Sequence, residues 1–381
     1  MIYLDHNATT PVAPQVAAGV VEQMRSNFGN PSSRHGVGRA ARAALEEARA
    51  RVAALVAAEP VQVVFTSGGT EANNLALKGF VHAMGVRRVR FSAVEHASVR
   101  APARFLASQG VDVAEIPVDP QGRVTPAALA QSLAGAGPTL VSIMAVNNET
   151  GVIQDIPALA EVVRHHGGWL HCDAVQAAGK IPLDWQALGV HLLSLSGHKL
   201  GAPKGAGALV VDKAVDLEPL CHGGGQERGR RPGTEALPAW VGFGLAAALA
   251  MEEQPVRERR WHELRRRLEA GLRRRFPEVV IFSESAPRVA NTSFFALPGL
   301  DGEALLLALD EAGFAVGSGS ACGRGEPSQV LQAMGVEREL AQGAVRVSLG
   351  AESEAAEIEA FLDALEAVVS RLRRFAGVVG G

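Results

Sequence analysis

The chain has 381 residues, 47% of them hydrophobic, and its 37 basic and 40 acidic residues give a net charge of −3. This length favours one large hydrophobic core and a second, smaller one. The near-neutral charge excludes the strongly basic field of a protein that binds nucleic acid or an anionic membrane directly, and it favours a small-molecule partner.

Strand-like and helix-like stretches alternate along the first half of the chain. Residues 1–11 indicate a short strand and a polar turn, and the apolar spacing predicts helices at 14–27 and 37–58. Strands are then predicted at 61–66, 89–92, 113–117, 140–146, 169–172 and 192–196, with an added strand at 205–212. The helices between them are predicted at 71–84, at a stretch ending near 109, at 126–134 and at 155–166. This alternation is typical of an α/β fold with a doubly wound, mainly parallel sheet covered on both faces.

The second half of the chain has a different pattern. An apolar helical run at 239–253 leads into an arginine-rich helix at 256–276, where interleaved glutamates indicate a solvated face rather than an RNA-binding surface. Shorter strands and helices alternate after it, at 279–282, 291–295, 302–312, 328–334, 344–348 and 353–375. We interpret this part as a smaller α+β domain. The predicted division is a large domain at 12–255 and a small domain formed by 1–11 and 256–381.

The three cysteines, Cys172, Cys221 and Cys322, are widely spaced and include no CxxC pair. An odd and sparse count favours free thiols in a reducing compartment over a disulfide framework. The first residues lack the basic and apolar regions of a signal peptide, and no apolar run approaches the about 18 residues of a membrane span. We therefore expect a cytoplasmic protein.

Lys199 stands where an apolar strand breaks into a loop, between Ser196 and His198. Ligand-binding residues of open α/β sheets gather at such strand ends. Only five of the 37 basic residues are lysines, so arginine provides most of the positive charge that faces solvent. A primary amine can form a Schiff base with an aldehyde, and Lys199 is the best-placed lysine for this chemistry. From these residues alone, the alternative that Lys199 is a loop lysine facing water remains open.

Other strand ends carry groups that suit a phosphorylated aromatic ligand. Gly69 and Thr70 open a predicted helix, where free backbone N–H groups and a hydroxyl can hold a phosphate. His96 ends a strand with a flat ring that can stack on an aromatic cofactor. An ordinary N-capped turn and a structural histidine are the alternatives.

Two further strand ends carry an amide and a carboxylate. Asn148 can hydrogen-bond a phenolate or a carboxylate, and Gln176 follows three residues after Asp173. A buried carboxylate needs a cationic partner, and a protonated pyridine nitrogen is one. With a lysine and a phosphate cradle at the same sheet edge, this combination indicates pyridoxal 5'-phosphate. The alternatives are a helix-capping aspartate and a metal site formed by His165, His166, His171 and Cys172.

Short motifs follow one another along nearly the whole chain, at 3–5, 8–11, 67–71, 95–96, 147–151, 173–176, 194–199, 223–227 and 318–322. The combination of SGHK at 196–199 with SGSAC at 318–322 is highly specific. In these motifs the chain resembles the cysteine desulfurases of iron–sulfur cluster assembly, which belong to the class-V aminotransferase superfamily. The resemblance implies a fold-type I architecture with pyridoxal 5'-phosphate as the cofactor.

The resemblance also assigns roles to single residues. Lys199 would bind the cofactor covalently, His96 would stack on its ring, and Asp173 would pair with its pyridine nitrogen. Arg346 is expected to bind the substrate carboxylate, and Asn148 lies in both the cofactor and the substrate site. Gln176 is expected near the ring oxygen. The phosphate would be held by Gly69, Thr70, Ser196 and His198, with Thr234 reaching across from the other subunit of a homodimer.

Cys322 lies among glycines and serines, a composition typical of a mobile loop, where Arg324 or a protonated histidine can lower the thiol pKa from about 8.5. The resemblance implies that Lys199 or His96 removes the α-proton of L-cysteine and that the Cys322 thiolate takes the sulfur as a persulfide while alanine leaves. The sulfur would then pass to an acceptor protein, either an iron–sulfur scaffold or a tRNA-thiolation enzyme.

Three residues separate Cys322 from Glu326, fewer than in relatives with this motif, which predicts a shorter reach toward an acceptor. Cys172 is expected to be buried and inert, whereas Cys221 is a second candidate for a reactive thiol. Two rival interpretations are a related pyridoxal enzyme, such as a selenocysteine lyase or an aminotransferase, and a non-enzymatic docking protein for sulfur carriers.

Overall fold

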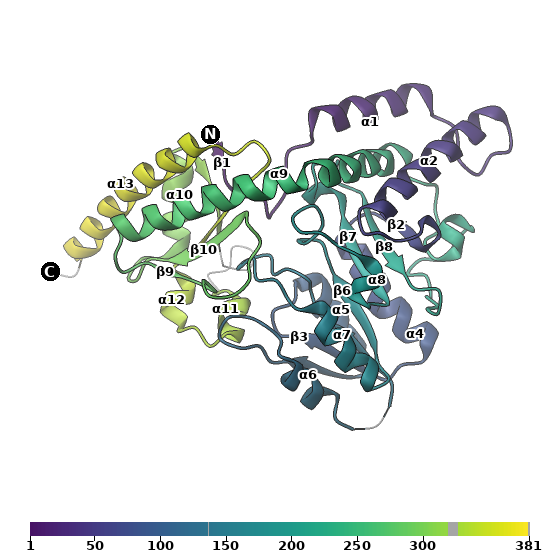
Figure 1. Cartoon of the computed structure of the whole chain (residues 1–381), viewed down its shortest axis with the longest axis horizontal. Helices are drawn as coiled ribbons and strands as arrows, with labels where there is room; N and C mark the ends of the chain where they lie inside the picture. Colours follow the sequence, from purple (N-terminus) through teal and green to yellow (C-terminus); the bar gives the residue numbers. More distant parts are fainter. Residues whose placement is uncertain (136, 319–326, 380–381) are drawn as a thin grey trace.

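The computed structural model describes residues 1–135, 137–318 and 327–379. Figure 1 shows a larger and a smaller body, each built around a sheet, with one long helix running along both. The helix is α9 (Leu237–Arg275). It joins the two bodies because its first half packs in the core of the larger body and its second half in the core of the smaller one.

The larger body is a seven-stranded sheet whose middle and one edge are parallel. In spatial order its strands are β2 (Val63–Thr66), β8 (Gly207–Val211), β7 (Leu192–Ser196), β6 (Trp169–Asp173), β5 (Thr139–Ser142), β3 (Arg88–Ser92) and β4 (Asp112–Ile116). The added strand expected at 205–212 is therefore an interior strand, β8, antiparallel to both of its neighbours. The predicted mainly parallel sheet is confirmed.

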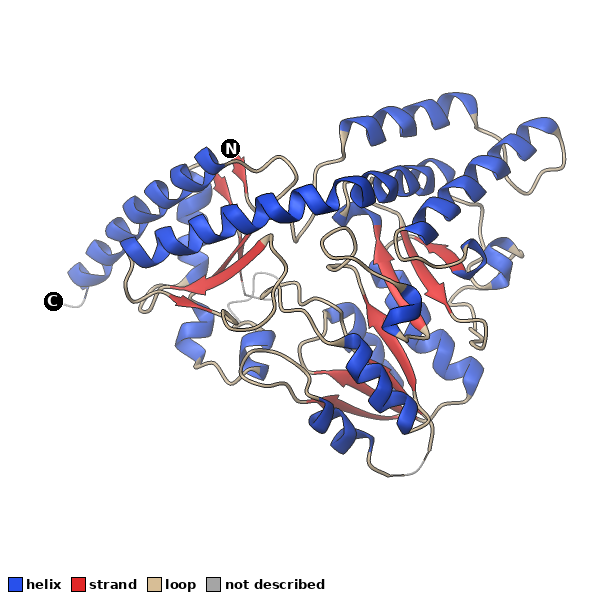
Figure 2. Cartoon of the chain, viewed as in Figure 1, coloured by secondary structure: helices blue, strands red, loops and turns tan. Residues whose placement is uncertain are grey.

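Helices cover both faces of this sheet (Figure 2), and the strands are correspondingly apolar on both faces. One face is covered by α2 (Gly36–Ala54), α6 (Pro126–Leu133), α7 (Ile156–His165) and the first half of α9, and the other by α3 (Gly69–Asn74), α4 (Phe80–Met84) and α5 (Ala97–Ser108). The remaining helices of this body are α1 (Pro14–Ser26) and the short α8 (Trp185–Leu188).

The helical stretches expected at 239–253 and 256–276 form the single helix α9, with Pro255 inside it. Proline removes one helical hydrogen bond, but packing on either side keeps the helix continuous. Trp240 stacks on Phe65 at 4.8 Å in the large core, and Leu264 and Leu268 are buried in the small core. Burial of both halves therefore outweighs the local cost of the proline.

The smaller body has a four-stranded antiparallel sheet in the order β12 (Gly317–Ser318), β13 (Ala344–Ser348), β10 (Thr292–Ala296) and β9 (Val280–Ile281). The N-terminal β1 (Ile2–Tyr3) pairs in parallel with β11 (Phe314–Ala315), so the first residues lie in this body. Its helices are α10 (Gly302–Glu311), α11 (Gln329–Ala333), α12 (Arg338–Gln342) and α13 (Ala355–Val379). The exact domain division at residue 255, inside α9, remains a prediction.

In the part of the chain that the structure describes, no helix combines the length and apolar character needed to cross a bilayer.

Candidate active site

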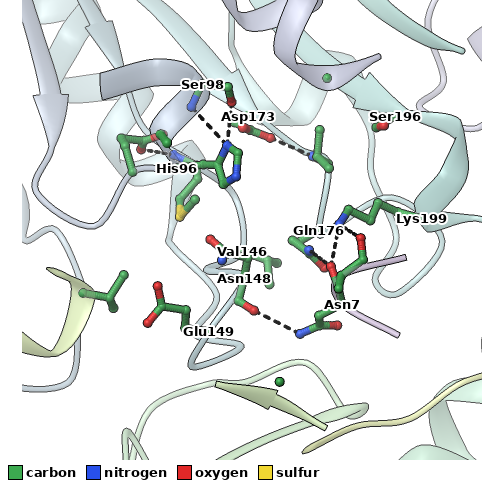
Figure 3. A pocket seen from close by; sticks show the side chains of 18 of the residues that line it. Asn7, His96, Ser98, Val146, Asn148, Glu149, Asp173, Gln176, Ser196 and Lys199 are labelled. Carbon is green, nitrogen blue, oxygen red and sulfur yellow. Dashed lines mark hydrogen bonds between the residues drawn. The ribbon is translucent and has the colours of Figure 1, made fainter. Parts of the chain in front are cut away.

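A cavity of about 750 Å³ lies where the carboxyl ends of the central strands of the large sheet meet the smaller body. Figure 3 shows side chains from both bodies pointing into it. Ten of the residues predicted from the sequence line this cavity: Gly69, Thr70, His96, Asn148, Asp173, Gln176, Ser196, His198, Lys199 and Arg346.

Lys199 ends a tight 3-10 turn, Gly197–Lys199, directly after β7. Its Nζ donates to the backbone oxygens of Asn7 at 2.5 Å and Ala8 at 2.6 Å. Burial, and then the positive charge of Arg346, lower the pKa of Lys199 to about 8. An amine with this pKa is neutral in roughly a tenth of the molecules at pH 7, which makes it available as a nucleophile or base.

Gly69 and Ser196, two of the groups predicted to hold a phosphate, are neighbours, because an added Cβ on Gly69 would lie 3.4 Å from Ser196 Cβ. Gly69 opens α3 so close to the sheet that an added Cβ would lie 2.8 Å from Val175 Cγ2. The Ser196 Oγ is buried without a hydrogen-bond partner among the described residues. Burial, followed by the charges of Lys199 and Lys204, lowers the pKa of His198 to about 4, so this imidazole is neutral.

Asp173 ends β6, and two N–H donors fix its carboxylate. The Asn73 side chain donates to Oδ2 at 2.7 Å, and the backbone N–H of Val175 donates to Oδ1 at 3.0 Å. Glu95 lines the same cavity, and burial followed by the negative charge of Asp173 raises the pKa of Glu95 well above its usual value. The raised pKa favours the protonated, neutral form of Glu95.

His96 is the N-cap of α5. Its Nδ1 accepts the backbone N–H of Ser98 at 3.1 Å and lies 2.7 Å from the Ser98 hydroxyl (Figure 3). Burial lowers the pKa of His96, which favours the neutral ring. Because Nδ1 accepts a hydrogen bond, we assign the ring proton to Nε2.

Arg346 enters the cavity from β13 of the smaller body. One guanidinium nitrogen donates to the backbone oxygen of Asn148 at 2.8 Å and another to Asp5 Oδ1 at 2.7 Å. Gly317 on β12 pairs with Arg346, and an added Cβ there would lie 2.8 Å from both Arg346 and Asp5. The glycine therefore leaves the room that this ion pair occupies.

Three cavity residues or close neighbours were assigned no role from the sequence. Asn7, which is 2% exposed, contacts both bodies through Thr292, Gln176 and Lys180. The Glu149 carboxyl lines the cavity, and burial raises its pKa to about 7. Lys180 is buried near Lys199. The sequence could have indicated it only through the small number of lysines in the chain.

Two predicted residues cannot be placed in the cavity of their own chain: Thr234, which is predicted to act on the other subunit, and Cys322, which lies outside the described residues. Thr234 is exposed in the loop before α9 and does not line the cavity of its own chain. The turn before it, Gln226–Gly229, is anchored by Glu227, which accepts two hydrogen bonds of 2.6 Å from Arg49. Cys322 lies outside the described residues, as do Arg324 and Glu326. On either side of that segment, Ser318 and Gln329 line the cavity.

The other cysteines and histidines also have defined positions. Cys172 is fully buried as expected, and burial raises the pKa of its thiol well above the usual value, whereas Cys221 is exposed. Both ring nitrogens of His171 are engaged, with Ser142 Oγ at 2.8 Å and Ser194 Oγ at 2.9 Å. Since neither nitrogen is free, His171 is not available to the alternative metal site.

Comparisons with known proteins agree with this arrangement. Residues 2–361 match the family described as aminotransferase class-V. Cysteine desulfurase IscS of Dictyoglomus turgidum is 39% identical over 98% of this chain and 95% of the relative, and a cysteine desulfurase of Cereibacter sphaeroides is 44% identical over 98% and 96%. Among solved structures, the NifS-like protein from Rickettsia africae superposes with a TM-score of 0.90 at 35% identity, covering 97% of this chain and 99% of that one. The structure of SspA in complex with cysteine gives 0.79 at 31% identity, covering 92% and 99%.

Proposed function

Because this chain belongs to the class-V aminotransferases, and within them to the pyridoxal-phosphate-dependent cysteine desulfurases, we propose that it takes the sulfur of L-cysteine onto its own Cys322 as a persulfide. The observation that carries this proposal is the cavity itself. Lys199, Asp173 and His96 line one side, and Arg346 and the residues flanking the segment of Cys322 line the other.

The residues of the cavity fit pyridoxal 5'-phosphate. The unpartnered hydroxyl of Ser196 and the closely approached Gly69 suit a phosphate, which accepts hydrogen bonds from both hydroxyls and backbone N–H groups. We propose that these residues, with Thr70 and His198, hold the phosphate. His96 supports the ring, and Asp173 keeps the ring nitrogen protonated.

When bound, the cofactor withdraws electrons from the α-carbon of the substrate. Lys199 Nζ takes the proton from that carbon, because its lowered pKa of about 8 gives it a neutral amine near physiological pH. His96 is less suited to this step, since its Nδ1 already accepts from Ser98 and its Nε2 carries the proton. Of the two bases left open by the sequence, the geometry therefore favours Lys199.

Arg346 binds the substrate carboxylate and turns the thiol of the substrate toward Cys322. A guanidinium suits this task because it can donate two parallel hydrogen bonds to a carboxylate. The Cys322 thiolate attacks the substrate sulfur, so that an S–S bond forms while the C–S bond breaks. The electron pair of that bond stays with the carbon, which is protonated and leaves as alanine.

We further propose that the protein is a cytoplasmic homodimer in which Thr234 completes the phosphate site of the other subunit. Large apolar side chains are exposed on and beside α1, where Met24 is 63% and Phe28 79% exposed. Such a surface suits a subunit interface. The persulfide would pass to an acceptor protein, an iron–sulfur scaffold or a tRNA-thiolation enzyme, over the short reach that three residues between Cys322 and Glu326 allow.

The experiment compares wild type with Cys322→Ala, and with Cys221→Ala as a matched control for an exposed thiol. Each protein receives L-cysteine and a reductant, and alanine, sulfide and cofactor absorbance are measured. We expect Cys322→Ala to keep the bound cofactor and to form neither product, while Cys221→Ala behaves as wild type. Sulfide production that persists unchanged in Cys322→Ala would favour the lyase or aminotransferase interpretation instead.

A further inference from the structure

Lys180 is a second lysine beside the cavity, in the turn that follows β6. It is 6% exposed, and its Nζ donates to Asn7 Oδ1 at 2.7 Å and to Gln176 Oε1 at 2.6 Å. Both of these partners are neutral, and no carboxylate forms an ion pair with Lys180 among the described residues. Burying an amine without an ionic partner costs folding free energy, so its presence here suggests that the residue has a role in the site.

The two hydrogen bonds determine how the neighbouring amides are oriented. The Lys180 amine donates in both hydrogen bonds, so Asn7 and Gln176 both turn their oxygens toward it. The nitrogen of each amide then points elsewhere. Gln176 Nε2 donates to the backbone oxygen of Asn7 at 2.8 Å, and Asn7 Nδ2 donates to Thr292 Oγ1 at 2.9 Å.

The same network reaches the catalytic lysine. The backbone oxygen of Asn7 accepts from Gln176 Nε2 and also from Lys199 Nζ at 2.5 Å, so Asn7 is held on one side by Lys180 and on the other by Lys199 (Figure 3 shows the Asn7, Gln176 and Lys199 part). The charged groups that face Lys180 are Lys199 and Arg346, and the imidazole of His6 is also near.

We infer that Lys180 is a positioning residue of the cofactor site, which fixes the amide of Gln176 and the backbone of Asn7 and thereby places Lys199. This inference rests on the proposed function, because it takes Lys199 and Gln176 to be cofactor residues. Lys180 lines a separate cavity of about 200 Å³ on the other side of Lys199, so it acts through its neighbours and not by contact with substrate.

The test uses Lys180→Met, which keeps a long apolar side chain and removes the donor, beside Lys213→Met as the control for an exposed lysine. The dissociation constant of pyridoxal phosphate and the absorbance spectrum of the bound cofactor are measured. We expect Lys180→Met to weaken cofactor binding about tenfold, the effect of losing one to two hydrogen bonds that orient the site. We also expect it to give the spectral change that Gln176→Ala gives. Lys213→Met should match wild type.

Two further variants keep the test decisive. Lys180→Arg retains donors, and the adjoining 200 Å³ cavity gives its longer side chain room, so its cofactor affinity should stay within about threefold of wild type. In the double variant Lys180→Met with Gln176→Ala, the two effects should be less than additive, because one acts through the other. Unchanged affinity in Lys180→Met, additive effects, or an Arg variant as weak as the Met variant would overturn the inference. Wild type that binds no cofactor or releases no alanine would instead overturn the proposed function.

Discussion

The two halves of the cavity are built in different ways. On the side of the large sheet, each functional side chain stands at a strand end or helix start and is fixed by near neighbours, as Asp173 is by Asn73 and Val175. On the side of the smaller body, a long guanidinium, that of Arg346, reaches in from β13. The large-sheet half therefore holds the groups whose protonation matters, and the smaller body supplies a positive charge.

The halves are nevertheless coupled by electrostatics. The positive charge of Arg346 is the second cause, after burial, of the lowered pKa of Lys199, while Asp5 and Asp173 act in the opposite direction. A change in the small-body half should therefore be visible in the titration of the large-body half. The following predictions test where this division holds and where it fails.

The largest effect is expected from Lys199→Ala in the large-body half. Loss of a positioned base costs about a thousandfold or more in kcat. Single-turnover alanine formation measures it, and Lys204→Ala is the matched control because Lys204 is exposed on the following loop. A residual rate within tenfold of wild type would move the role of base to another residue.

Arg346→Gln tests the small-body half. Losing charged hydrogen bonds to the substrate carboxylate should raise KM by roughly 10- to 100-fold, with a smaller change in kcat. Steady-state kinetics with L-cysteine separate the two constants. Since Arg346 also binds Asp5 and the backbone of Asn148, thermal unfolding of the variant must be measured beside it. An unchanged KM would contradict the assignment of the carboxylate site.

The pH dependence of covalent cofactor capture tests the coupling. With a pKa of about 8, Lys199 is mostly protonated at lower pH, so the capture rate should rise toward pH 8 and level off above it. In Arg346→Gln the loss of a positive neighbour favours the protonated amine, so the midpoint should move upward by roughly one unit. Stopped-flow absorbance after adding pyridoxal phosphate to the cofactor-free protein gives both profiles. Coincident profiles would mean that the halves are independent.

The smallest effect is expected at Glu149, which joins the halves through a hydrogen bond from Ser328 Oγ. Glu149→Ala leaves the buried hydroxyl of Ser328 without an acceptor for its proton, although it still accepts from the Leu331 N–H, and should lower the free energy of unfolding by about 1 kcal/mol. Glu149→Gln keeps an acceptor oxygen and should stay near wild type. Thermal unfolding compares them, with the exposed pair Glu161→Ala and Glu161→Gln as control. Equal losses in both Glu149 variants would mean that the carboxyl itself is required.

The sequence predicted the large-body half better than the small-body half, for a physical reason. Asp173 ends β6, Lys199 ends the turn after β7, and His96 lies four residues beyond β3 as the N-cap of α5. The carboxyl ends of parallel strands meet at one edge, so local pattern was enough to bring these residues together. The role of Arg346 in binding the substrate carboxylate was predicted only from the resemblance to a family. The antiparallel β8 was expected as an added strand, but its place inside the sheet depends on long-range pairing.

Contacts between distant segments explain the rest of what was missed. Asn7 forms hydrogen bonds with Gln176, Lys180 and Thr292, which are far from it in the chain. No periodic pattern in the sequence predicts such a residue. Lysine is rare in this chain, which makes Lys180 a candidate for a specific role. The rarity of the residue type does not predict which groups its amine contacts. Glu149 lies in the motif at 147–151, but its partner Ser328 is 179 residues away, so no local pattern predicts the contact.

The most direct test of the central claim is mass spectrometry of the protein after one equivalent of L-cysteine, with thiols alkylated and no reductant present. The account predicts one added sulfur atom on the peptide that contains Cys322, in wild type and in Cys221→Ala, and none in Lys199→Ala. Alanine formed without sulfur on Cys322, or with sulfur on Cys221 instead, would contradict it.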